Sequence, residues 1–118
     1  MTGGISPRLL LRLVETRLDE PDLSPAAIAV AAGISVRHLH RLFAAMGLRF
    51  ADHVRACRLE RCRAALGDPV QGARSVTDIA FSWGFNDAAH FSRCFRAAYG
   101  TSPRAWRASR VAGGALAA

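Results

Sequence analysis

The stretch S-V-R-H-L-H-R-L-F-A-A-M, residues 35–46, decides how this chain folds. Written as a helix, it has an apolar face on which residues recur at intervals of three and four: Leu39, Leu42, Phe43 and Met46. The opposite face carries Arg37, His40, Arg41 and Ala44. Ser35 is a suitable N-cap, because its hydroxyl can accept a hydrogen bond from a free N–H of the first turn. We predict an amphipathic helix with a basic outer face.

The residues just before this helix complete a larger motif. I-A-V-A-A-G-I, residues 28–34, reads as a short apolar helix that ends at Gly33. A helix of small residues, a glycine turn and a capped helix with a basic face are typical of a helix-turn-helix.

The motif occurs twice. The pattern I-A-x-x-x-G at residues 28–33 returns at residues 79–84, an offset of 51. The pattern H-x-x-R-x-F at residues 38–43 returns at residues 90–95, an offset of 52. The difference of one residue between the two offsets falls in a turn, where an insertion costs little. The second copy keeps its apolar face in phase: Phe91, Cys94, Phe95 and Ala98. We predict two helix-turn-helix units.

Start and stop signals predict an all-α fold of about seven helices. They place helices at residues 7–19, 25–32, 35–46, 50–66, 76–83, 87–99 and 103–106, with Asn86 or Asp87 capping the sixth. Residues 67–75 read as a loop. The expected domains are a first helix-turn-helix subdomain over residues 1–48, a linker helix over 49–67, a second subdomain over 68–108 and a disordered tail over 109–118.

The net charge of +7 favours an acidic partner, either nucleic acid or an anionic membrane surface. All sixteen basic residues are arginine, which a GC-rich genome explains at least as well as phosphate recognition does. The longest apolar run is far below the ~20 residues that cross a bilayer. The three cysteines form no C-x-x-C pair and suit a reducing cytoplasm, so we expect no disulfide, zinc site or other cofactor.

The two motifs, their order and the helix between them resemble the DNA-binding domain of the AraC/XylS family of transcription regulators. The match runs over residues 23–107 and is most specific in three stretches: S-x-R-H-L-x-R-L-F (35–43), R-L-E-R-C-R-A-A-L (58–66), and I-A-F-S-W-G-F-N-D-A-A-H-F-S-R-C-F-R-A-A-Y-G-T-S-P-R-A-W-R (79–107). The resemblance implies sequence-specific binding of double-stranded DNA to regulate transcription, with the second helix of each unit in a major groove.

The resemblance also implies site residues and partners. Base contacts are expected from Arg37, His40 and Arg41 in the first unit and from Asp87, Ala88, Ala89, Ser92 and Arg93 in the second. Weaker phosphate contacts are expected from Ser35, Arg49, Arg74 and Arg96. RNA polymerase is an expected partner. Members of the family usually carry an effector-binding or dimerisation domain as well, so the chain is either a C-terminal piece of a longer regulator or a small stand-alone member.

Other functions explain the sequence less well. His53 and Cys57 have the spacing for contact on a helix, but a nucleophile also needs a pocket and an orienting group, so no enzyme is expected. A DNA-alkyl-acceptor protein would need a four-cysteine cluster. His38 and His40 point apart on a helix and make no metal pair. A basic helical module that binds proteins or membranes remains the alternative, although it does not explain the repeated glycine turns.

Three residues outside the recognition helices have structural interpretations. Trp83 and Trp106 are expected to be core residues rather than base-stacking groups. Arg58 is expected to form a structural salt bridge, with Asp78 as a possible partner, or to contact phosphate.

The helix at residues 50–66 sets a spacing. Its length of about 25 Å at ~1.5 Å per residue, with the half-widths of the flanking units, predicts recognition helices roughly 34 Å apart, the spacing of successive major grooves.

Overall fold

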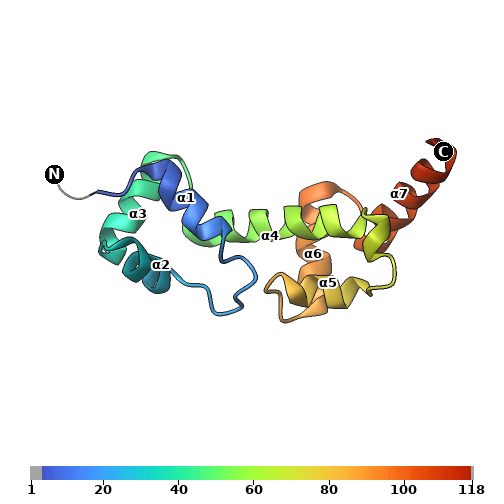
Figure 1. Cartoon of the computed structure of the whole chain (residues 1–118), viewed down its shortest axis with the longest axis horizontal. Helices are drawn as coiled ribbons and strands as arrows, with labels where there is room; N and C mark the ends of the chain where they lie inside the picture. Colours follow the sequence, from blue (N-terminus) through green and yellow to red (C-terminus); the bar gives the residue numbers. More distant parts are fainter. Residues whose placement is uncertain (1–3, 118) are drawn as a thin grey trace. The chain divides into compact units, whose positions relative to one another are not determined.

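The computed structural model of the chain describes residues 4–117, with side chains described as far as residue 110. Within these residues the chain forms seven α-helices, one short 3-10 helix and no strand, which confirms the all-α prediction (Figure 1). None of these helices is long and apolar enough to cross a membrane. The elements are α1 (Pro7–Glu15), α2 (Pro25–Ala32), α3 (Val36–Ala45), α4 (Phe50–Leu66), η1 (Pro69–Gln71), α5 (Val76–Ser82), α6 (Ala88–Tyr99) and α7 (Pro103–Ala117).

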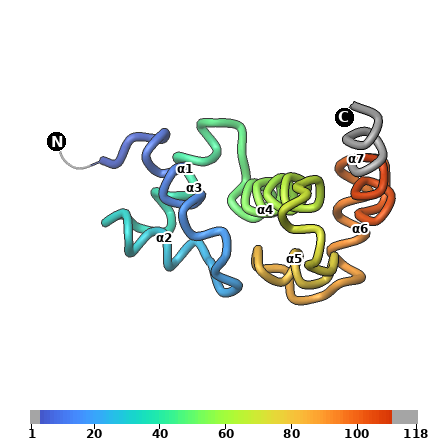
Figure 2. The backbone as a smooth tube through the Cα atoms, turned by 45° about the vertical axis from the view of Figure 1, so that its right-hand side comes forward, coloured from blue at the N-terminus to red at the C-terminus, as the bar shows by residue number. Residues whose placement is uncertain are grey.

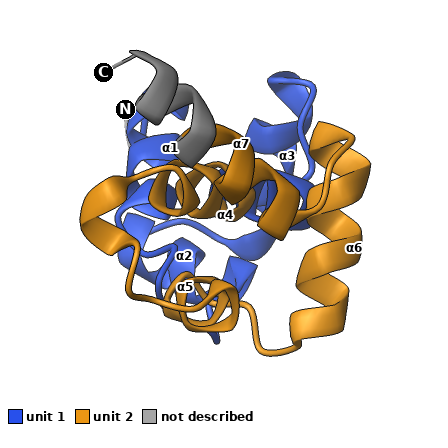
Figure 3. Ribbon diagram, turned by 90° about the vertical axis from the view of Figure 1, so that its right-hand side faces the viewer, with its two compact units in different colours: residues 1–57 blue, residues 58–118 orange. Residues whose placement is uncertain are grey.

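The chain divides into two compact units, residues 1–57 and 58–118, and the boundary falls inside α4 (Figure 3). The sequence interpretation made this helix a linker separate from both subdomains. In the structure its first half buries Phe50 and Val54, and its second half buries apolar residues that include Leu59. Each half therefore supplies part of a hydrophobic core.

The first unit packs α1 against α2 and α2 against α3 (Figure 2). Serine caps begin all three helices, since the hydroxyls of Ser6, Ser24 and Ser35 accept hydrogen bonds from N–H groups three residues on, at 3.0–3.2 Å. The rings of Phe43 and Phe50 meet edge to face with centroids 5.5 Å apart. The buried apolar residues of this unit are Leu10, Val14, Leu18, Ile28, Ala29, Leu39, Phe43, Phe50 and Val54.

The second unit has its own core, built by α5, α6, α7 and the second half of α4. Its centre is a series of aromatic rings: the centroids of Phe85 and Phe91 lie 5.0 Å apart, and those of Phe95 and Tyr99 lie 4.7 Å apart. The core residues are Leu59, Cys62, Ala65, Leu66, Ile79, Ala80, Phe85, Phe91 and Phe95. Trp83 and Trp106 are partly buried against this cluster, which confirms that they are core residues.

The two helix-turn-helix turns repeat each other bond for bond. Ile34 N–H donates to the carbonyl of Ala29 at 3.0 Å, and Phe85 N–H donates to that of Ala80 at 3.1 Å. The glycine between these partners has positive φ in both copies, +71° at one and +96° at the other. This arrangement satisfies the free carbonyls at the helix end. The sequence repeat is therefore also a structural repeat.

Three boundaries differ from the prediction. Helix α1 ends at Glu15 rather than at residue 19, because the backbone then changes to turns, in which Arg17 N–H donates to the carbonyl of Val14 at 3.0 Å and Glu20 N–H to that of Arg17 at 3.1 Å. The loop at residues 67–75 contains η1, which Asp68 caps through a 3.0 Å bond from Val70 N–H. Helix α7 continues to Ala117, whereas the prediction ended it at residue 106 and made residues 109–118 a disordered tail. Residues 104–112 contain neither proline nor glycine, so no helix-breaking residue follows directly after residue 106.

Candidate nucleic-acid interface

The first candidate surface is the outer face of α3. Arg37, His40 and Arg41 are all exposed there, while Leu39 and Phe43 on the opposite face are buried. Neither arginine forms a hydrogen bond or an ion pair with the described residues. The outer face of α3 therefore presents two uncommitted guanidinium groups, each able to donate two parallel hydrogen bonds to a guanine edge.

The second candidate surface is the outer face of α6. The predicted residues Ala88, Ala89, Ser92 and Arg93 are exposed, and Phe91 and Phe95 on the opposite face are buried. The side chains on this face are short, apart from those of Arg93 and, one turn further along, Arg96. Compared with α3, α6 offers fewer donors to a ligand and allows its backbone a closer approach.

Asp87 is the residue that caps α6. Its Oδ1 accepts hydrogen bonds from the N–H groups of Ala89 at 2.9 Å and His90 at 3.1 Å. The bond from His90, aided by that from Ala89, lowers the pKa of the Asp87 carboxyl below its ordinary value of 3.8. The carboxylate is thus occupied in holding the first turn of α6, and its expected contact with DNA stays a prediction.

The residues expected to contact phosphate differ in how free they are. Arg49 and Arg96 are exposed and form no hydrogen bond or ion pair with the described residues. The guanidinium of Arg74 instead donates to Oε1 of Gln71 at 3.2 Å and to the carbonyl of Asp78 at 3.4 Å. The Ser35 hydroxyl caps α3.

Arginine and aromatic side chains brace the second unit in a way that the sequence interpretation missed. Trp106 Nε1 donates to the carbonyl of Arg63 at 3.0 Å, and the Arg63 guanidinium lies over the rings of both Trp106 and Tyr99. Glu60 completes the group by accepting bonds from Arg63 and from the Tyr99 hydroxyl at 3.1 Å. These contacts join α4 to α6 and α7, and they link residues about 40 positions apart, which no local pattern reveals.

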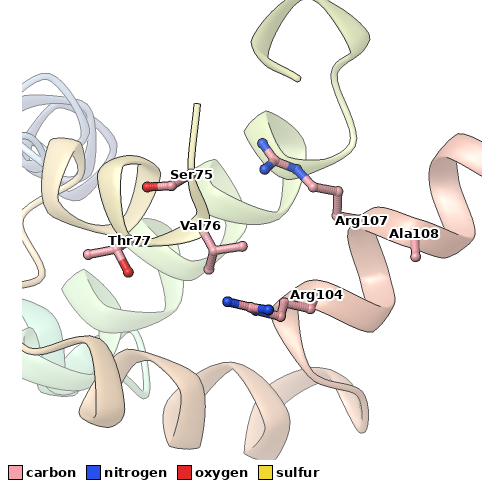
Figure 4. Close-up of a pocket in the computed structure, with 6 residues that line it drawn as sticks. All are labelled: Ser75, Val76, Thr77, Arg104, Arg107 and Ala108. Atoms are coloured by element: carbon pink, nitrogen blue, oxygen red, sulfur yellow. The ribbon is translucent and has the colours of Figure 1, made fainter. Parts of the chain in front are cut away.

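A shallow pocket of about 370 Å³ lies between the start of α5 and α7 (Figure 4). Arg104 reaches from α7 towards Val76 and Thr77. Arg107, beside it, donates to three backbone carbonyls, at 2.6 Å to Arg74, 3.1 Å to Gln71 and 3.4 Å to Leu66. Arg107 therefore fastens the loop after α4 rather than offering its guanidinium to a ligand.

The cysteines and histidines form pairs rather than clusters. Cys57 Sγ lies 3.5 Å from Nε2 of His53, and Cys94 Sγ lies 3.6 Å from Nε2 of His90. Burial raises the pKa of the Cys62 thiol to about 12, so this sulfur stays protonated at neutral pH. Among the described residues, no group of three or more His, Cys, Asp or Glu side chains is placed to hold a metal ion.

Comparison with known proteins identifies the family. The pattern of a helix-turn-helix domain family matches residues 28–109, a span that includes both glycine turns and α4. A solved transcriptional regulator of Chromobacterium violaceum, described as an AraC-type DNA-binding domain-containing protein, superimposes with a TM-score of 0.79. The alignment has 32% sequence identity and covers 89% of this chain and 91% of that one. The chain belongs to the AraC-type helix-turn-helix family.

Curated relatives agree with this AraC-type assignment. Transcriptional activator NphR of a Rhodococcus species is 38% identical over 96 residues, which cover 81% of this chain and 28% of the relative. HTH-type transcriptional regulator GlxA of Rhizobium meliloti is 38% identical over 108 residues, covering 89% of this chain and 32% of the relative. The chain thus spans about a third of the length of the curated relatives it matches.

Proposed function

We propose that the chain binds double-stranded DNA sequence-specifically, with α3 and α6 inserted in successive major grooves, and thereby regulates transcription. One observation carries the proposal: two capped helices follow glycine turns with matching hydrogen bonds, and each exposes the outer face from which the resemblance implies base contacts. The net charge of +7 supplies attraction to phosphate.

The two faces are proposed to contribute unequally. Arg37, His40 and Arg41 give α3 several long donors, whereas α6 offers mainly alanine and Ser92 beside Arg93. The groove read by α3 should therefore show the stronger base preference. Because the two helices differ, the site of one monomer should not be palindromic and should extend over about 15–20 base pairs, two half-sites one helical turn apart.

Selection of bound duplexes from random DNA, followed by hydroxyl-radical footprinting of the selected site, tests the proposal. We expect two protected patches about ten base pairs apart with one monomer bound. A single patch, or a symmetric site that needs two monomers, would contradict it. Equal binding to all duplexes at fixed salt would favour the alternative, a basic interaction module.

Substitution of Arg41 tests the role of α3 directly. Arg41→Ala should relax the preference at one or two base pairs and cost about 1–3 kcal/mol on the selected site, the value of one bidentate pair. Arg49→Ala is the matched control, because an arginine that touches only phosphate should weaken binding to all duplexes alike. An unchanged preference in Arg41→Ala would remove α3 from the role of reader.

Partners and location are further parts of the proposal. The relatives are about three times as long as this chain and are named as transcription activators or regulators. We infer that RNA polymerase is a partner, that an effector-binding or dimerisation domain accompanies the DNA-binding one in the complete regulator, and that the protein acts in the cytoplasm on nucleoid DNA. Sequencing of the upstream reading frame tests the second of these inferences.

A further inference from the structure

The two turn glycines have the same backbone role but different surroundings. A Cβ added to Gly33 would meet nothing within 4 Å. A Cβ added to Gly84 would lie 2.6 Å from Cζ of Arg58 and 2.7 Å from its Nε and Nη2. Real Cβ atoms essentially never approach a neighbour so closely. The positive φ of +96° favours glycine at position 84. A methyl group there would also displace the Arg58 guanidinium, which is the far end of a flexible side chain.

Arg58 reaches this position from α4. Its side chain is half-buried, and this burial lowers the pKa of the guanidinium below its ordinary value. The guanidinium occupies the place beside buried Gly84 where a Cβ would otherwise stand. The contact joins α4 to the turn between α5 and α6. In the first unit the corresponding face of Gly33 is open, so the contact belongs to the second motif.

The turn is coupled to the recognition helix through the next residue. Phe85 follows Gly84 and is buried, and its ring meets that of Phe91 on the inner face of α6 with centroids 5.0 Å apart. Phe85 N–H also donates to Ala80 at 3.1 Å, which fixes the turn to α5. A shift of Gly84 away from α4 would therefore move Phe85 and, with it, the first turns of α6.

We propose that Arg58 is a positioning residue for the second recognition helix: its guanidinium seats the α5–α6 turn against α4 and so sets where the outer face of α6 lies. This inference rests on the proposed function. It gives Arg58 a role other than the salt bridge or phosphate contact that the sequence predicts. Arg58 touches no base in this role, and its effect on sequence preference passes through Gly84.

The first experiment separates the two half-sites. On a duplex selected by the wild-type chain, each half is scrambled in turn, and the loss of affinity is measured for wild type, Arg58→Ala and Arg58→Lys. Arg41→Ala and Arg93→Ala identify which half belongs to α3 and which to α6. In Arg58→Ala we expect the penalty for scrambling the α6 half to fall at least fivefold, while the penalty for the α3 half keeps its wild-type value. Arg58→Lys should restore little of the penalty for scrambling the α6 half, because a lysine ammonium lacks the planar face of a guanidinium.

An equal loss on both halves, or an unchanged penalty for the α6 half, would overturn the proposal. If the wild-type chain itself showed no preference in either half, the proposed function would be refuted instead. Gly84→Ala covers the case in which Arg58→Ala does not fold: it keeps Arg58 but displaces it, and should reproduce the loss in the α6 half. Gly33→Ala, the matched control, should leave the penalty for the α6 half unchanged.

The second experiment tests the contact without DNA. The melting temperature should fall further for Gly84→Ala than for Gly33→Ala. Both substitutions place alanine in a strained left-handed backbone conformation, but only the one at Gly84 also brings a methyl group against the Arg58 guanidinium. In the Arg58→Ala background the collision is gone, so the additional fall caused by Gly84→Ala should shrink to that of Gly33→Ala. A fall of the same size in both backgrounds would show that Arg58 and Gly84 are not coupled and would overturn the contact.

Discussion

Removal of the Arg107 side chain should destabilise the second unit strongly. This guanidinium donates from Nη1, Nη2 and Nε to the backbone carbonyls of Arg74, Gln71 and Leu66. The bonds at 2.6 Å and 3.1 Å have good hydrogen-bonding distances, whereas the one at 3.4 Å is weak. Arg107 thus fastens the end of α4 and two points of the segment between α4 and α5.

The expected magnitude follows from the two good bonds. A hydrogen bond to a charged group contributes about 1.5–3 kcal/mol net. Arg107 is only half-buried, so water partly replaces its bonds when it is removed. The lower end of the range applies, and Arg107→Ala should lower the free energy of unfolding by about 2–3 kcal/mol. For a unit of this size that corresponds to a fall in melting temperature of roughly 8–24 °C.

Thermal unfolding followed by circular dichroism measures this effect. Arg104→Ala is the matched control, because Arg104 lines the same pocket but is exposed and forms no hydrogen bond or ion pair with the described residues. It should shift the melting temperature by no more than a few degrees. The melting temperature of Arg107→Lys should lie close to that of Arg107→Ala, because a lysine ammonium cannot reproduce the planar fork of N–H groups with which the guanidinium reaches three carbonyls. Equal melting temperatures for Arg104→Ala and Arg107→Ala would refute the reasoning.

Two further predictions concern charge. The hydrogen bonds that Asp87 accepts from His90 and Ala89 lower the pKa of its carboxyl. The Asp87 carboxylate should therefore stabilise α6 at pH values above its ordinary pKa of 3.8, and this stabilisation should be lost as the pH falls through the lower pKa of the folded state. Asp87→Ala should therefore melt below wild type at pH 7, with a difference that shrinks below pH 3.8, while Asp87→Asn keeps the cap; a difference independent of pH would contradict this. Binding to DNA should weaken with salt, with log K falling against log salt at about −0.9 for each of roughly 4–8 neutralised phosphates, and a slope near zero would exclude phosphate attraction.

Local chemistry made much of the fold predictable. The bounds of α4 agree with the predicted residues 50–66, and the Ser35 cap and the glycine turns at Gly33 and Gly84 lie where the pattern placed them. These features depend on a few neighbouring residues, so the sequence shows them directly. The end of α1, the turn η1 and the length of α7 were missed, because they depend on weak balances between helix and turn that a pattern does not resolve.

The candidate site was predictable in its geometry and less so in its support. The phase of the apolar residues was enough to place Arg41 and Arg93 on outer faces. Two contacts were not predictable: that between Arg58 and Gly84, and the hydrogen bonds from Arg107 to three backbone carbonyls. They join residues 26 to 41 positions apart. Periodicity carries information about which side of a helix is buried, but none about which distant carbonyl or glycine an arginine reaches.

The two motifs, although repeats of each other, place different demands on their scaffolds. An arginine such as Arg41 has a long flexible stem and can still reach a base when its helix is displaced by an ångström. Alanine has no such freedom: Ala88 and Ala89 can touch a thymine methyl only if the backbone of α6 lies at the right depth in the groove. A recognition helix with short side chains therefore depends more on how firmly it is held. The brace of Arg58 on Gly84 is present in the second unit, and the corresponding glycine of the first unit is open.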